Sequence, residues 1–557
     1  MGNNCKLFRW GVIAFFLLTY LLPLGWRPMI TPDEFRYGEI PREMIASGDY
    51  ISPRLIGIRY FEKPVYGYQL TALSMLVFGE NAFAVRLPSA LCAGLAAWLL
   101  YFLVLKFRKD EALALLSSLL YLTCGLVYGI GVFAVLDSQM TAFITGILAF
   151  YFLALHAEAP RERRKYLVLS GCCCGLAFLT KGFIAFAVPA VTVIPYLLWE
   201  RRFKAMFTTP WLLLLFAVLV AGPWCLAIHW EEPSFWHYFF WVEHYQRFFE
   251  ETSGQHPEPF WFFLPVILGG IFPAALLLGG MILGFKQRVK TLWRDPLLKY
   301  ALLWFIMPLL FFSCSSGKLA TYVLPCFAPL AIIGATGLLA YLRAGGRKTL
   351  DLTLNILAII LLVAAVGFTV AQLLVHLDLC PGLYSKAEFY KWIPPVVTVL
   401  YWGGILWFFR RKALSFRLGT FFFGLALVII AGQAAFPHQV GVGKAQAEQL
   451  EKFRQNIPDD AVLLVHPNVM HAAAWIYRRT DFYFPHTGGE LEHSLSAYPE
   501  YADRLITGDR YAEFIRQNQD RLILLMRSRS PNYLPAGWKQ PPFERCEDRL
   551  WLVKFQD

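Results

Sequence analysis

The chain has 557 residues, of which 57% are hydrophobic and only 16% are charged, with a formal net charge of +12 at pH 7. Soluble domains are closer to half apolar and a quarter charged, so this composition excludes an ordinary soluble protein and indicates extensive contact with lipid. The 48 Phe, 26 Tyr and 18 Trp residues agree with this conclusion, because aromatic rings concentrate at membrane interfaces.

Apolar stretches recur along the chain as far as about residue 436, and a stretch of about 20 residues crosses a bilayer as a helix. The sequence predicts about thirteen such spans. They lie at approximately 8–28, 84–105, 111–131, 138–157, 166–180, 183–200, 210–230, 260–285, 298–315, 321–342, 350–376, 393–409 and 416–436. The first resembles a signal peptide, but no small-residue cleavage site follows, so we interpret it as a retained span.

The orientation of the spans follows from the Lys and Arg residues between them, because cytoplasmic loops are enriched in both. With thirteen spans, every basic cluster falls in an alternate connection. The clusters lie near residues 6–9, 106–109, 161–165, 201–204, 286–294, 343–348 and 410–412. This pattern predicts a cytoplasmic N-terminus and a C-terminus on the outer face. It also explains the positive net charge without a nucleic-acid partner.

The first outer loop, residues 29–83, is expected to carry juxtamembrane helices. One helix should have Thr31 as its N-cap and Pro32 at its first helical position, and should end at Gly48. Glu34, three residues after the cap, fits a capping box, so a structural role is favoured for it. The later apolar stretch 66–79 is too short to span and predicts an interfacial or re-entrant helix.

Asp33 is the first candidate for chemistry. A carboxylate in the first turn of a helix is also stabilised by the helix dipole, so its position alone does not make it catalytic. However, Arg36 and Tyr37 follow three and four residues later and share its helix face. The loop therefore places a carboxylate, a guanidinium and a phenol together beside the membrane.

Further charged residues lie at the outer ends of the spans. Glu62 and Lys63 are adjacent in the first loop, where a solvated pair is the simpler interpretation. Asp137 is flanked by apolar residues, where a charged carboxylate without a partner is energetically unfavourable. Lys181 follows a short apolar stretch. Extension of its ammonium toward the membrane interface would explain this position as well as a functional role would.

Two outer segments could bind a metal or a phosphate. His237 and His244 are seven residues apart on one face of a helix, and with Glu243 or Glu62 they would form a two-histidine, one-carboxylate metal site. The spacing is not diagnostic, so an aromatic interfacial helix is favoured. Lys318 and Tyr322 lie four apart beside a glycine, which suits phosphate binding. No nucleotide-binding motif is present.

The tail, residues 438–557, is more polar than the rest of the chain. Strand-like runs alternate in it with helix-like segments, which predicts a small α/β domain. The strands are expected at 461–465, 521–526 and 550–553, and the helices at 443–455 and 510–518. The predicted fold class is thus mostly α: a polytopic membrane domain, residues 1–437, followed by an α/β domain on the outer face.

Several stretches recur in the order expected of one known family. They are Pro32-Asp-Glu-Phe-Arg-Tyr37, Arg59-Tyr-Phe-Glu-Lys-Pro64, Ala134-Val-Leu-Asp137, Thr180-Lys-Gly182, Phe235-Trp-His-Tyr-Phe-Phe-Trp-Val-Glu-His244 and Gly317-Lys-Leu-Ala-Thr-Tyr322. By these motifs, nearly the whole chain resembles the bacterial aminoarabinose transferases of lipid A modification. Those enzymes move 4-amino-4-deoxy-L-arabinose from undecaprenyl phosphate to lipid A phosphates. They are GT-C membrane glycosyltransferases, similar to the protein O-mannosyltransferases.

The resemblance implies roles for the candidate residues. Asp33 would be the main catalytic carboxylate and Asp137 its partner, and Glu62 would sit nearby in a metal-binding or structural role. Tyr37 and Glu62 are also expected to be substrate-binding or structural residues. The residues expected to line the donor phosphate are Arg36, Lys63, Lys181, Lys318 and Tyr322. Two departures from the family pattern concern this phosphate region. Ala320 replaces an expected Pro. Cys314-Ser-Ser316 lacks the Lys that precedes the Gly in better-known members, so Lys318 would have to provide more of the contact with the donor phosphate.

The implied reaction is a single in-line displacement that inverts the anomeric centre. A lipid A phosphate is already a nucleophile, because its second pKa is near ~6. Asp33 is therefore expected to orient a substrate and stabilise developing positive charge rather than remove a proton. No cofactor is expected to be required, and a divalent metal held by Glu62, His237 and His244 is the weaker alternative. The expected setting is the bacterial inner membrane, with the active site periplasmic, lipid A as acceptor and the chain a monomer.

Three other functions remain open from the sequence. A GT-C enzyme with another polyprenyl-linked sugar or a protein acceptor would have a similar fold and similar carboxylates. A lipid-sugar transporter would be expected to show ionisable residues at mid-membrane and repeated halves, and the sequence shows neither pattern. A receptor without catalytic activity would leave the charged cluster of the first outer loop unexplained.

Overall fold

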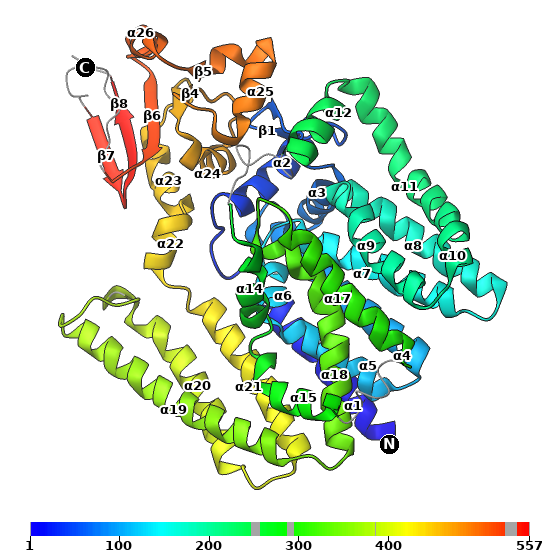
Figure 1. Cartoon of the computed structure of the whole chain (residues 1–557). Coiled ribbons are helices and arrows are strands. Elements are labelled where there is room, and N and C mark those ends of the chain that lie inside the picture. The colour runs from blue at the N-terminus through cyan, green and yellow to red at the C-terminus, as the bar shows by residue number, and fades with distance from the viewer. Residues whose placement is uncertain (1, 247–256, 287–293, 385, 530–542, 556–557) are drawn as a thin grey trace.

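The computed structural model describes residues 2–246, 257–286, 294–384, 386–529 and 543–555. Helices form the larger part of the molecule, and a small sheet lies near the C-terminus, beyond the ends of the long helices (Figure 1). The first half of the helical part contains α1 (Gly2–Phe16), η1 (Leu17–Leu21), α4 (Ala82–Arg108), α5 (Glu111–Thr123), α6 (Gly125–Gly131), α7 (Asp137–His156), α8 (Pro160–Lys181), α9 (Ile184–Trp199), α10 (Phe203–Thr208) and α11 (Pro210–Glu231). The second half contains η4 (Phe260–Phe262), α14 (Phe263–Gly270), η5 (Ala274–Leu277), α15 (Leu278–Lys286), α17 (Pro296–Ser313), η6 (Ala320–Cys326), α18 (Phe327–Arg343), α19 (Lys348–His376), η7 (Lys386–Trp392), α20 (Ile393–Phe408) and α21 (Leu414–Ala434).

Each of the thirteen predicted spans falls on a described helix or on a bent pair of helices. Within the described residues, seven helices are long and apolar enough to cross a membrane, and two further pairs, α5 with α6 and α14 with α15, qualify if each bent pair is one span. The other four predictions fall on α1 with η1, α8, α9 and α20, which are shorter or carry more charge. The chain is therefore a multi-pass membrane protein, while thirteen crossings stay a prediction. Among these seven helices α7 is the most enclosed, because 94% of its most apolar 18-residue stretch is buried inside the protein.

The two bent pairs touch at their breaks. The backbone N–H of Gly125, the first residue of α6, donates to the carbonyl of Phe272, between α14 and η5, at 2.7 Å. A Cβ atom at Gly125 would lie 2.8 Å from that oxygen, so a larger residue would push the two breaks apart. The bends of 68° and 79° are thus coupled by one close backbone contact.

The first outer loop contains α2 (Asp33–Ser47), a hairpin of β1 (Arg54–Leu55) and β2 (Ile58–Arg59), and α3 (Tyr66–Phe78). Gly48 ends α2 at φ 73°, as predicted, and α3 confirms the short helix expected at 66–79. The predicted capping box is wrong. Pro32 occupies the N-cap position, and the buried hydroxyl of Thr31 has no hydrogen-bond partner among the described residues. The Glu34 carboxylate instead accepts from the Ile30 N–H at 3.0 Å and from two arginines.

The C-terminal part follows α21 through α22 (His438–Lys444) and α23 (Ala447–Phe453). Its four-stranded sheet has the order β3-β6-β8-β7, in which only β3 and β6 run parallel. The strands are β3 (Val462–Val465), β6 (Leu522–Arg527), β7 (Phe543–Glu547) and β8 (Leu550–Lys554), with the pair β4 (Phe484–Pro485) and β5 (Leu505–Ile506) beside them. The remaining elements are η8 (Arg454–Asn456), α24 (Pro467–Tyr477), η9 (Gly489–Leu491), α25 (Glu492–Ala497), η10 (Pro499–Arg504) and α26 (Asp509–Asn518).

The sheet confirms all three predicted strands, and α23 and α26 fall on the two predicted helices. The boundary at residues 437 and 438 stays a prediction. Helix α24 packs against α2, where a Cβ at Gly38 would lie 3.1 Å from the Trp475 ring. The C-terminal part therefore lies directly on the helix that begins with Asp33.

Candidate active site

Asp33 is the first residue of α2, and a chain of ion pairs runs from it into the C-terminal part. Arg36 Nη1 lies 3.1 Å from Asp33 Oδ1, and Arg36 Nη2 lies 2.5 Å from Glu490 Oε2. Glu490 Oε1 also lies 2.6 Å from His471 Nε2, on α24. The Asp33 side chain is 41% exposed, whereas Arg36 and Glu490 are 14% and 15% exposed. Asp33 is thus the accessible end of a chain whose other members are enclosed.

Glu490 and Asp33, the two carboxylates in this series of ion pairs, have opposite pKa shifts. Burial raises the pKa of Glu490, but His471 and Arg36 outweigh burial and lower that pKa to about 2. Burial raises the pKa of Asp33; Arg36 opposes the shift, and the charges of Glu490 and Asp137 add to it. Glu490 is therefore a fixed anion that holds Arg36, while Asp33 is the more basic carboxylate.

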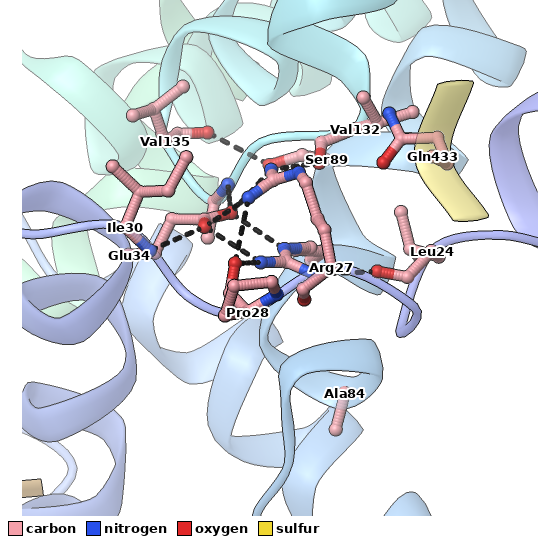
Figure 2. A network of polar contacts seen from close by, with 12 residues as sticks. Leu24, Arg27, Pro28, Ile30, Glu34, Ala84, Ser89, Val132, Val135 and Gln433 are labelled. Atoms are coloured by element: carbon pink, nitrogen blue, oxygen red, sulfur yellow. Dashed lines mark hydrogen bonds and ion pairs between the residues drawn. The ribbon is translucent and has the colours of Figure 1, made fainter. Parts of the chain in front are cut away.

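A buried ion network fixes the start of α2 (Figure 2). Glu34 accepts hydrogen bonds from Arg27 at 2.7 and 3.0 Å and from Arg86, on α4, at 2.7 and 2.8 Å. The Ala134 N–H also donates to Glu34 at 3.2 Å, and Arg27 donates to the Val132 carbonyl at 3.0 Å. These last two contacts reach the segment that leads into α7. Glu34 is therefore structural, and its network ties the segment before Asp33 to the segment before Asp137.

Asp137 is the first residue of α7 and lies against the end of α8. Lys181 Nζ, at that end, is 2.6 Å from Asp137 Oδ1. The same Nζ lies 5.6 Å from the centre of the Tyr322 ring, on η6. The consecutive helices α7 and α8 and the distant η6 thus bring together a carboxylate, an ammonium and an aromatic face. Because Asp137 contributes to the raised pKa of Asp33, the two candidate catalytic carboxylates belong to one electrostatic centre.

Glu62 and Lys63 lie beside this centre, because the charges of Glu490 and Arg36 also act on the Glu62 carboxyl. Lys63 Nζ forms an ion pair with Glu243, on η2 (Tyr238–Gln246), and lies 3.9 Å from Glu62 Oε2. Burial raises the pKa of Glu62; Lys63 opposes this shift and Glu243 adds to it. The adjacent pair is therefore enclosed, and the simpler interpretation of a solvated loop pair is wrong.

Tyr37 and Lys318 have mainly structural contacts. The Tyr37 ring stacks on Tyr68, of α3, with centroids 5.9 Å apart, so it joins α2 to α3. Lys318 is 4% exposed and donates to the carbonyls of Glu258, at 2.7 Å, and Ser315, at 2.5 Å. Two carbonyls therefore occupy the ammonium that was expected to bind phosphate. The roles of all the candidate residues stay predictions.

The metal hypothesis receives no support from the described residues, among which no group of three or more His, Cys, Asp and Glu side chains could hold a metal ion. Glu62 lies 3.9 Å from Lys63, and Glu243 forms an ion pair with the same lysine. His237 ends α12 (Phe235–His237) near His493. The side chain of His244 lies outside the described residues.

The sequence did not predict the partners that complete the site. These are Arg27, Arg86, His471 and Glu490. The sequence indicated Glu243 only as a metal ligand and not as the partner of Lys63. Arg86 carried a usable signal, because an arginine inside an apolar span needs a partner. Glu490 carried none, since it lies 454 residues from Arg36 in a polar segment.

Sequence comparisons place the chain among named enzymes. Residues 6–239 match the family model of dolichyl-phosphate-mannose-protein mannosyltransferases, and residues 443–554 match that of the C-terminal domain of the arabinosyl transferase ArnT. An undecaprenyl phosphate-α-4-amino-4-deoxy-L-arabinose arabinosyl transferase from Shewanella sediminis is 36% identical over 551 residues, which are 98% of this chain and 97% of that protein. One from Pectobacterium carotovorum is 38% identical over 503 residues, covering 89% of this chain and 88% of that protein.

The fold also matches a solved structure. The crystal structure of ArnT from Cupriavidus metallidurans bound to undecaprenyl phosphate is similar with a TM-score of 0.78 and 21% identity, covering 97% of both chains. This likeness confirms the predicted fold class, a GT-C membrane fold with a C-terminal α/β domain. Because identity above 30% extends over nearly the whole length of this chain and its relatives, the chain is a glycosyltransferase that belongs to the undecaprenyl phosphate-α-4-amino-4-deoxy-L-arabinose arabinosyl transferase family.

Proposed function

We propose that this chain transfers 4-amino-4-deoxy-L-arabinose from undecaprenyl phosphate to the phosphate groups of lipid A, acting as a monomer. The observation that carries the proposal is the likeness, over 98% of the chain, to a transferase named for this donor. The shared fold with a structure that holds undecaprenyl phosphate adds support.

The reaction is placed at the periplasmic face of the bacterial inner membrane, with the N-terminus in the cytoplasm and the C-terminal part outside. The spans around the site support this orientation, because cytoplasmic loops are rich in Lys and Arg. Helix α7 begins at Asp137, and α8, which ends at Lys181, follows it. The basic cluster at 161–165 lies at the joined ends of these helices, opposite the site.

The cations of the site suit the departing lipid phosphate. Arg36, Lys63 and Lys181 each contact a different carboxylate. An ammonium has three N–H donors, so Lys63 and Lys181 can keep their carboxylate contact and still bind a phosphate oxygen. A phosphate leaving group stabilised in this way needs no general acid, and preorganised cations are an effective means of stabilising developing negative charge.

Asp33 and Asp137 suit the positive charge of the reaction. The donor sugar carries an amine, and positive charge also develops on the sugar ring as the bond to phosphate breaks. The acceptor phosphate is ionised near neutral pH, with a second pKa near ~6, so it needs no base. Asp33, the more exposed carboxylate, orients the substrates and stabilises the sugar, while Asp137 holds Lys181 and is available to the donor amine.

A second candidate function follows from the match of residues 6–239 to the protein mannosyltransferase model. Transfer to a protein hydroxyl would require a general base, and burial raises the pKa of Asp33 in the direction that favours proton acceptance. The nature of the acceptor separates the two functions.

Lipid A mass spectrometry tests the proposal directly. A Gram-negative strain that lacks its own transferase would receive the native chain, Asp33→Ala, or Asp503→Ala. Asp503 is a matched control because its side chain is 93% exposed in the C-terminal part. We expect an aminoarabinose increment on lipid A with the native chain and the control, and no increment with Asp33→Ala at equal membrane expression.

The same strains should differ in polymyxin survival, because a cationic sugar lowers the negative charge that attracts cationic peptides. An increment with Asp33→Ala would remove Asp33 from the mechanism. A native chain that modifies no lipid A, and instead adds sugar to a protein, would replace the first function with the second.

A further inference from the structure

A cationic pocket lies between the C-terminal part and the loop that leads into α2. Its volume is about 390 Å³. Thr31 and Pro32 line one side, and the end of β6 lies on the other. Four cations line it, and we call it the arginine pocket: Lys444, Arg527, Arg529 and Arg549.

Among the residues that the structure describes, nothing neutralises the charges of the arginine pocket. In the part of the chain that the structure describes, no carboxylate forms an ion pair with any of its four cations. Arg527 donates instead to the carbonyl of Gly443. Burial, and then the positive charge of Arg549, lower the pKa of Arg527 from its ordinary value. Like charges thus oppose one another here, and a bound anion would relieve their repulsion.

The other groups of the arginine pocket also suit an oxyanion. The Thr31 hydroxyl is buried and has no hydrogen-bond partner among the described residues, so it is a donor available to a ligand. Guanidinium groups bind phosphate through paired N–H donors, and an ammonium adds a point charge. Three guanidiniums, an ammonium and a hydroxyl around one small pocket form a donor set for a phosphate group.

The arginine pocket is continuous with the candidate active site. Thr31 and Pro32 directly precede Asp33, and the Thr31 N–H donates to the Lys444 carbonyl at 2.7 Å. On the other side, Asn468 lines the pocket near the start of α24, the helix that carries His471. A ligand in the pocket would therefore contact both elements that position Asp33 and Arg36.

We propose that the arginine pocket binds a phosphate group, and that during transfer this is the second phosphate of the lipid acceptor. The identity of the acceptor rests on the proposed function above. While one acceptor phosphate attacks the sugar beside Asp33, the other is held in the arginine pocket, which orients the acceptor. The donor has a single phosphate, which the cations Arg36, Lys63 and Lys181 already accommodate.

The test compares two acceptors, bisphosphorylated and monophosphorylated lipid A, with the purified full-length chain at saturating donor. The pocket variant is Arg529→Gln/Arg549→Gln, because both side chains are exposed and form no internal ion pair among the described residues. The control, Arg510→Gln/Arg521→Gln, removes the same charge from α26 and from the residue before β6, at the opposite end of that strand.

We expect the ratio of kcat/KM for the bisphosphorylated over the monophosphorylated acceptor to fall about tenfold in the pocket variant, since one charge-assisted contact is worth about that factor. The control should keep the native ratio. A ratio that stays native in the pocket variant would overturn the proposal. Equal losses with both acceptors would also overturn it, because the lost contact would then not depend on the second phosphate.

Two further measurements separate the possible sources of the phosphate. Millimolar inorganic phosphate should raise the thermal unfolding temperature of the native chain more than that of the pocket variant, whether or not sugar is transferred. If this difference appears but the native chain modifies no lipid A, the phosphate site stands and the acceptor assignment falls together with the proposed function. The second measurement compares the transfer activity of the pocket variant in vesicles of phosphatidylglycerol and of phosphatidylcholine. A loss of transfer activity in the pocket variant that occurs only in phosphatidylglycerol would assign the pocket to a membrane headgroup and overturn the acceptor assignment.

Discussion

Replacing Glu34 by Gln should destabilise the chain strongly without changing the size of the side chain. The Glu34 side chain is fully buried, and its partners Arg86 and Arg27 are 0% and 7% exposed. Their guanidiniums donate four hydrogen bonds to the carboxylate, at 2.7 to 3.0 Å. Loss of one partner from a buried ion pair costs about 3–5 kcal/mol, because the remaining charge stays buried and uncompensated.

The measurement is the free energy of unfolding in mixed detergent and SDS micelles, followed by tryptophan fluorescence. Glu451→Gln is the matched control, because Glu451 pairs with Arg454 at 2.9 Å but is 57% exposed, and exposed pairs contribute about 1 kcal/mol or less. In the double variant Glu34→Gln/Arg86→Gln, the cost should be smaller than the sum of the two single costs, since the two charges compensate each other.

Glu34→Gln should also lower the transfer rate of the molecules that remain folded, because the network joins the segments before Asp33 and Asp137. A Glu34→Gln chain that unfolds at the same SDS fraction as the native chain and the Glu451→Gln control would refute this reasoning. It would mean that Arg27 and Arg86 find other compensation.

Three further outcomes are expected. Lys181→Met should lower kcat about 10²-fold, because preorganised charge at the leaving group is lost, and Lys181→Arg should restore part of the rate. Glu490→Gln removes an anion that raises the pKa of Asp33 and leaves Asp33 as the anionic partner of Arg36 in this series, so the acid limb of the kcat/KM profile should move to lower pH. A shift to higher pH would contradict the assignment. Chelation with EDTA should leave transfer intact, because the cations of the site stabilise the leaving phosphate; a loss that is reversed by added divalent metal would show that a metal is needed.

The membrane-spanning stretches could be predicted because the thickness of the bilayer imposes their length and composition. The breaks within them could not. The bend between α5 and α6 depends on the contact of Gly125 with the Phe272 carbonyl, about 150 residues away in sequence, and no local pattern encodes such a contact. Helix α8 was predicted only from its apolar half, since its first turns carry the charges of residues 161–165.

The candidate site was predictable where short motifs carry it and unpredictable where it depends on tertiary contacts. Asp33 and Arg36 lie three apart on one helix face, so spacing alone brings them together. Glu34 fitted a capping box equally well, and only the buried position of Arg86 decided between a cap and an ion pair. Glu490 and His471 enter the site because the C-terminal part packs on α2, which the sequence of neither segment indicates.

The charge balance of the site explains why the C-terminal part would take part in transfer. The described centre contains more carboxylates than cations: Asp33, Glu62, Asp137, Glu243 and Glu490 against Arg36, Lys63 and Lys181, with His471 beside them. Such a centre favours a substrate with a positive group, as an amino sugar has, and disfavours a sugar without one. The same surplus repels an acceptor with several phosphates, so attraction of that acceptor requires cations outside the centre. The arginine pocket supplies them next to Asp33, where they can hold the acceptor without neutralising the carboxylates that the sugar needs.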